Sequence, residues 1–126
     1  MKRIHLGIIV ISVVMFFVAV ATDIFWIAKL IGRPFPKTMP VSQTVYSAFA
    51  VPDLLMSVLL YIGAFGLMKL RKFGLIFSLV AMGMWIFDSL LVLGITKLLR
   101  IDIVGFCLVF ATFTVGYLLH KKDIFD

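Results

Sequence analysis

The sequence predicts an all-α integral membrane protein, an up-down bundle of four helices with both termini in the cytoplasm. Of its 126 residues, 63% are apolar and only 14% are charged, whereas a soluble domain averages about 45–50% apolar and about 25% charged residues. The apolar residues are gathered into four long segments separated by polar connections. This composition excludes a soluble globular protein and a disordered chain.

Each apolar segment is long enough to cross a membrane as a helix. A helix needs about 20 apolar residues to span the hydrocarbon layer, with about 17 near the lower limit. Backbone groups in lipid must be hydrogen-bonded within their own segment, which favours helices over strands. Within a single transmembrane domain of residues 1–126, the helices are predicted at about 4–28, 46–68, 73–96 and 103–119.

The sequence is compatible with two start positions for the second helix. Pro52 suits the first turn of a helix, and Asp53 suits the positive end of the helix dipole. The helix either continues from Tyr46 with a kink at the proline, or begins at Pro52 after an interfacial or re-entrant segment at 41–51.

The orientation follows from the connections and from the basic residues. Short connections at 69–72 and 97–102 force neighbouring helices to be antiparallel. Seven Lys and Arg residues then lie at the rim that holds both termini and five at the opposite rim. Because positive charge is retained on the cytoplasmic side, both termini are predicted to be cytoplasmic, in the cell membrane.

The first segment has a second interpretation. Lys2, Arg3 and the small residues 19–21 resemble a cleavable secretory signal. The apolar run continues past that site through residues 24–27. This continuation favours a spanning helix that is retained.

Several function classes are disfavoured by what the sequence lacks. The basic residues that produce the net charge of +6 form small groups between apolar runs, which disfavours nucleic-acid binding. The single cysteine, Cys107, rules out an intramolecular disulfide and the membrane thiol oxidoreductases that use paired cysteines. His5 and His120 lack a third ligand, so no metal site is predicted. HExxH, GxSxG and Walker motifs are absent from the sequence, so neither an enzyme nor a cofactor is expected.

Three acidic residues lie inside the predicted spans, where a charge costs at least about 2.5–3.5 kcal/mol. At a rise of 1.5 Å per residue, Asp23 lies about 9 Å below the outer end of its helix. Asp53 and Asp88 lie about 10 Å and about 13 Å below theirs. Three carboxylates on three helices are therefore predicted at similar depth in the outer leaflet.

Helical spacing predicts which face of each helix packs against the others. Small residues line contacts between membrane helices because they let the backbones approach. In each predicted helix, an Asp shares one face with small residues. These faces are Ser12, Ala19 and Asp23; Asp53, Ser57 and Ala64; Gly74, Ser78, Ala81, Trp85 and Asp88; and Asp102, Gly105, Thr112 and Gly116.

The leading functional hypothesis is an outward-facing site for a cation, an amine or a proton. Asp23, Asp53 and Asp88 would line it, and Trp85 would supply an aromatic wall. Close carboxylates in a low dielectric cannot all be ionised, so at least one is expected to hold a proton.

The alternative is a non-catalytic accessory or assembly subunit of a homo-oligomer or a larger membrane complex. In that case the carboxylates would form ion pairs with cations at the helix ends, namely Lys29, Arg33, Lys97 and Arg100. A membrane enzyme with a pair of Asp residues as acid and base is the third hypothesis, and no hydroxyl, histidine or metal partner is predicted at the right depth to support it.

One stretch resembles a loose pattern in small, uncharacterised four-helix bacterial membrane proteins, and it covers about a third of the chain. The matching residues are Pro52 to Met56, Gly63 to Leu67, Arg71 to Gly74, Ala81 to Gly83, and Phe87 with Asp88. The resemblance implies a four-helix fold and a bacterial membrane, and it transfers no activity. Size and helix number are also similar to those of small multidrug transporters. Their hallmark Glu in the first helix is absent here, and Asp23 lies too near the rim to replace it.

Overall fold

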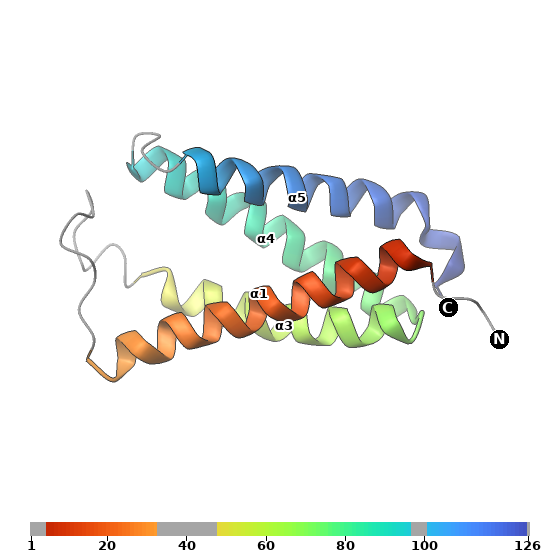
Figure 1. The fold of residues 1–126 in the computed structure, drawn as a ribbon, viewed down its shortest axis with the longest axis horizontal. Coiled ribbons are helices and arrows are strands. Elements are labelled where there is room, and N and C mark those ends of the chain that lie inside the picture. The colour runs from red at the N-terminus through yellow and green to blue at the C-terminus, as the bar shows by residue number, and fades with distance from the viewer. Residues whose placement is uncertain (1–4, 33–47, 97–100, 126) are drawn as a thin grey trace.

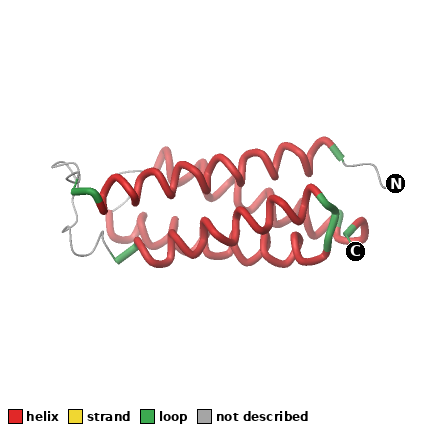
Figure 2. Tube along the Cα trace, turned by 90° about the horizontal axis from the view of Figure 1, so that it is seen from below, coloured by secondary structure: helices red, strands yellow, loops and turns green. Residues whose placement is uncertain are grey.

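The computed structural model of this chain describes residues 5–32, 48–96 and 101–125, and most of these residues are helical (Figures 1 and 2). All four long helices are long and apolar enough to cross a membrane. The predicted all-α class is confirmed, and the predicted number of helices with the length and hydropathy of membrane spans is confirmed as well. The elements are α1 (Leu6–Leu30), α3 (Ala50–Met68), α4 (Lys72–Thr96), α5 (Ile101–His120) and a short 3-10 helix, η1 (Lys122–Ile124).

Helix α3 begins four residues later than the longer of the two predicted helices. Its first residue is Ala50, so Pro52 lies in the first turn, where its missing N–H costs no helical hydrogen bond. The backbone N–H of Asp53 donates to the carbonyl oxygen of Phe49 at 2.9 Å. Asp53 therefore lies in the first turn of α3, as the proline predicted. Residues 41–47 of the predicted interfacial segment lie outside the described residues.

Consecutive helices run in opposite directions and pack in chain order, α1 on α3, α3 on α4 and α4 on α5 (Figure 1). The first turn of α1 and the last turn of α5 lie at one end of the bundle, which we call the terminal end. The opposite end, where α1 ends and α3 begins, is the distal end.

The closest helix contact lies between α3 and α4 at the terminal end. The backbones of Gly66 and Gly74 touch, and a Cβ atom on either glycine would overlap the backbone of the other helix. The turn between the helices is tight, with Leu70 in the left-handed region at φ 52° and a 2.9 Å bond from the Arg71 N–H to the Gly66 carbonyl oxygen. Gly74 and Ala81 are both buried, so the predicted small-residue face of this helix is confirmed.

The predicted packing face of the last helix is wrong. Thr112 and Gly116 are exposed, and no described atom lies within 4 Å of a Cβ built at Gly105 or Gly116. Asp102, also placed on that face, is exposed. Helix α5 instead buries apolar residues at intervals of seven, Val104, Ala111 and Leu118. Small residues mark an interface only where two backbones approach closely, and no such approach occurs at Gly105 or Gly116 among the described residues.

Helices α1 and α5 meet at the terminal end and separate toward the distal end (Figure 1). At the terminal end, Gly7 lies directly against the ring of Tyr117. Fully buried apolar side chains fill the terminal half, including Ile8, Met15 and Leu118.

Candidate functional site

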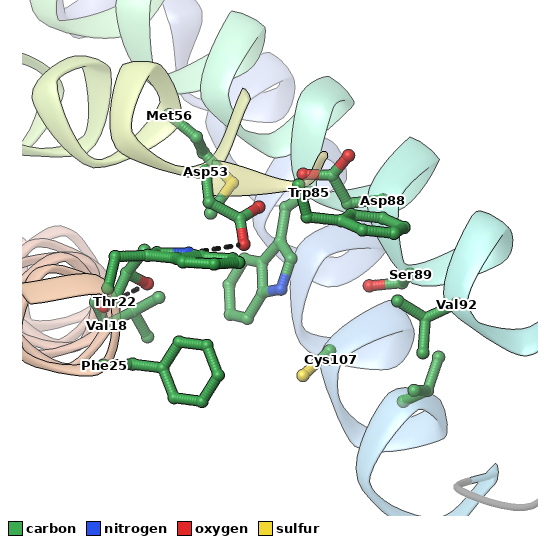
Figure 3. Close-up of a pocket in the computed structure, with 13 residues that line it drawn as sticks. Val18, Thr22, Phe25, Asp53, Met56, Trp85, Asp88, Ser89, Val92 and Cys107 are labelled. Atoms are coloured by element: carbon green, nitrogen blue, oxygen red, sulfur yellow. Dashed lines mark hydrogen bonds between the residues drawn. The ribbon is translucent and has the colours of Figure 1, made fainter. Parts of the chain in front are cut away.

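A cavity of about 240 Å³ occupies the distal half of the bundle (Figure 3). We call it the inner cavity. Side chains from α1, α3, α4 and α5 line it, and its two acidic residues are Asp53 and Asp88. Its aromatic lining residues are Phe25, Trp26, Phe49 and Trp85.

Asp53 reaches the inner cavity from the first turn of α3. Its Oδ2 atom accepts a hydrogen bond of 3.0 Å from Nε1 of Trp26 on α1. Figure 3 shows this bond crossing between the two helices. A carboxylate that accepts an indole N–H is held in one orientation, and the bond also connects the distal end of α1 to the start of α3.

Asp88 approaches Asp53 from α4. The two carboxyl groups lie within hydrogen-bonding reach of one another. The Oδ2 atom of Asp88 is buried and has no hydrogen-bond partner among the described residues. An unpartnered carboxylate oxygen in a low-dielectric region is costly, so this atom is the strongest indication of a missing ligand.

The aromatic lining of the cavity is ordered by contacts between rings. Phe25 packs edge-on against Trp26 with ring centroids 5.0 Å apart. Trp85 packs against Phe110 of α5 at 5.7 Å. The indole N–H of Trp85 faces the sulfur of Cys107, which also lines the cavity (Figure 3). Both tryptophans and the single cysteine of the chain therefore lie at one site.

Asp23 lies apart from the other two acids. Its Oδ2 atom accepts a hydrogen bond of 3.0 Å from the hydroxyl of Tyr61 on α3, and it does not line the inner cavity. Thr22 and Trp26, one helical turn apart, point into the cavity instead. The predicted depth of Asp23 is compatible with the cluster, but the rotation of α1 turns this side chain to a different side of the helix. The structure thus brings together Asp53, Asp88 and Trp85 and leaves Asp23 outside.

Sequence reasoning missed Trp26, Phe25, Phe49 and Cys107. A tryptophan near the end of a predicted span is typical of the aromatic belt at a membrane interface. That pattern does not reveal that the indole N–H of Trp26 donates to Asp53. The spacing of Val18, Thr22 and Trp26 could have predicted that these residues lie together, because residues four apart share a helix face.

Four cations at the helix ends were predicted to pair with the carboxylates, and only Lys29 lies within the described residues. Arg33, Lys97 and Arg100 are outside the described residues. The ammonium group of Lys29 lies over the ring of Phe25, 5.2 Å from its centroid. Within residues 5–32, 48–96 and 101–125, no group of three His, Cys, Asp or Glu side chains could hold a metal ion.

Comparison with protein-family models, curated proteins and solved structures finds no match for this chain. The chemistry of the inner cavity is therefore the basis for assigning a function. Paired carboxyl groups attract positive charge, and the faces of aromatic rings do the same. A site with both features recognises a cation that also carries apolar surface.

Proposed function

We propose that this protein binds a small organic monocation, a protonated amine or a quaternary ammonium, in the inner cavity. The observation that carries the proposal is the pair of carboxyl groups, Asp53 and Asp88, within reach of one another among four aromatic side chains. The protein would then act as a small membrane protein that binds or transports this ligand.

The charge of the pair matches a monocation. Two neighbouring carboxyl groups in a low dielectric disfavour a second negative charge, so one positive charge suits the pair better than two. A divalent metal ion is a poor match, because calcium takes six to eight oxygen ligands and magnesium requires near-octahedral coordination. The buried Oδ2 atom of Asp88 is available to accept a hydrogen bond from a ligand N–H or to face a quaternary nitrogen.

The aromatic side chains favour an organic cation over an inorganic one. A cation within about 6 Å of a tryptophan ring gains about 2 kcal/mol or more when it is desolvated. The volume of about 240 Å³ lies just below the roughly 300–1,000 Å³ of pockets that hold drug-sized ligands. The expected ligand is therefore an amine with one ring or a short alkyl chain.

We propose that the chain lies in a bacterial cytoplasmic membrane with both termini inside. The excess of Lys and Arg at the rim that holds the termini supports this orientation. The inner cavity then lies in the outer leaflet, at the extracellular side of the membrane.

Tryptophan fluorescence of the purified protein in detergent tests the proposal, because both tryptophans line the cavity. Titration with benzyltrimethylammonium is expected to give a saturable change, and its uncharged carbon analogue, neopentylbenzene, is expected to give none. Asp53→Asn and Asp88→Asn should each weaken binding at least about tenfold, equivalent to about 1.4 kcal/mol. Asp23→Asn is the matched control and should bind as the unmodified chain does. Equal binding by the neutral analogue, or by both cavity variants, would overturn the proposal.

A further inference from the structure

A second chamber of about 380 Å³ lies beside the inner cavity, between the start of α3 and the distal half of α4. We call it the outer chamber. Pro52, Gly83, Phe87 and Leu91 contribute to its walls, and Asp88 is the one charged residue among the described residues that line it. An apolar chamber with a single carboxyl group fits a molecule that has an apolar body and one positive charge.

The outer chamber and the inner cavity share two lining residues. Phe49 and Asp88 line both spaces, so they form the partition between them. A ligand in either space can approach the carboxyl group of Asp88. Phe49 precedes the first residue of α3, so its side chain stands at a helix end.

The walls of the outer chamber belong to the outside surface of the bundle. Phe87 is 65% exposed and Leu91 is 42% exposed, and Gly83 is exposed as well. Because α4 is long and apolar enough to span the membrane, this surface faces the acyl chains of the lipid. The outer chamber therefore opens toward the lipid, and it meets the inner cavity at Phe49 and Asp88.

We propose that the outer chamber is a lateral portal through which a lipophilic amine moves from the bilayer, past Phe49, to the carboxyl pair. This inference rests on the proposed function and extends it by naming the ligand class and its route. An amine with an alkyl chain partitions into the bilayer, where its apolar body fits the walls of the chamber. In the outer chamber, the nitrogen of the amine reaches the carboxyl group of Asp88.

Gly83 offers a way to close the portal without disturbing the fold. No described atom lies within 4 Å of a Cβ built at this position, so a larger side chain enters the chamber without a backbone clash. Gly94 on the same helix is equally open and exposed and does not line the chamber. Gly83→Phe and Gly94→Phe are thus a matched pair, with Gly83→Leu as a smaller second blocking variant.

The test measures binding rates in phosphatidylcholine vesicles by stopped-flow tryptophan fluorescence, with dimethylhexylamine as the probe. Gly83→Phe is expected to slow association and dissociation by about tenfold or more and to leave the dissociation constant within about twofold. Gly83→Leu should have a smaller effect in the same direction, and Gly94→Phe should match the unmodified chain. Phe49→Ala removes the partition and should accelerate both rates.

The outcomes separate the portal from the binding site. Unchanged rates in both Gly83 variants, with saturable binding intact, would overturn the portal and leave the proposed function standing. A weaker equilibrium affinity with an unchanged association rate would also overturn it, because the chamber would then be part of the binding site. Loss of saturable binding in the unmodified chain would instead refute the proposed function.

Discussion

The indole N–H of Trp26 donates a hydrogen bond of 3.0 Å to the carboxylate of Asp53, which lies 27 positions later in the chain. The bond joins the last turns of α1 to the first turn of α3 at the distal end, where α1 and α5 have separated. The other oxygen of Asp53 lies on the side of Asp88 (Figure 3).

Trp26→Phe tests whether this bond stabilises the fold. The phenyl ring keeps most of the buried apolar surface and removes the donor, which leaves a half-buried carboxyl without its partner. We expect a loss of about 1–3 kcal/mol in unfolding free energy, measured by circular dichroism in detergent. In a double-mutant cycle with Asp53→Ala, the two effects should be clearly less than additive. Additive losses would mean that the bond contributes nothing of its own.

Asp88→Asn separates a binding site from a structural ion pair. In a binding site without a fixed cation, an amide of the same shape is tolerated because it leaves no charge of the protein unpaired. Thermal stability should then stay equal or rise, while the response to benzyltrimethylammonium disappears. If Asp88 instead pairs with a cation, the variant leaves a charge unpaired, and a buried pair would cost about 3–5 kcal/mol. Such a loss, rescued by neutralising Lys97 or Arg100, would favour the ion-pair interpretation.

Gly74→Leu and Ala81→Leu test the contact between α3 and α4. Gly74 touches the backbone of Gly66, and Ala81 is fully buried, so each larger side chain must displace a helix. Overpacking typically costs about 1–3 kcal/mol, and melting in detergent should report a loss of at least this size. Gly116→Leu is the control, since its side chain enters open space on α5. Equal melting of all three variants would mean that this interface does not limit stability.

Cys107 provides a chemical probe of the inner cavity, because it lines the cavity and is the single cysteine of the chain. Benzyltrimethylammonium at saturating concentration should slow the reaction of Cys107 with N-ethylmaleimide at least about fivefold, on the premise that 80% or more of the sites are occupied. Mass spectrometry of the labelled protein measures the rate. In the matched control, Cys107→Ser with Gly105→Cys, the thiol lies in open space on the same helix, and the ligand should give no protection. Equal protection at both positions would indicate an effect away from the cavity.

The proposed orientation predicts which ends of the helices are reachable from outside the cell. In a Cys107→Ser background, Thr38→Cys should react with a membrane-impermeant maleimide applied to whole cells. Lys122→Cys should react only after the cells are opened. The opposite pattern would mean that the termini lie outside and that the inner cavity faces the cytoplasm.

The spans and most of one inner face could be predicted from the sequence because they depend on local properties. Mean hydropathy and segment length identify a spanning helix, and the period of 3.6 residues aligns Gly74, Ser78 and Ala81, which are all buried. Pro52 likewise marks the first turn of α3 and so places Asp53 near a helix end. Each of these features can be predicted from one segment alone, without reference to the other helices.

The composition of the site was decided only by the tertiary structure. Depth along each helix was predictable, but the rotation of one helix against another depends on how all the side chains pack. That rotation pairs Asp53 with Asp88, turns Asp23 to Tyr61 and brings Trp26 to the carboxylate. The same dependence explains α5, where Thr112 and Gly116 are exposed while Val104, Ala111 and Leu118 are buried. Hydropathy and period are properties of one segment, whereas a site between four helices exists only once their relative rotations are set.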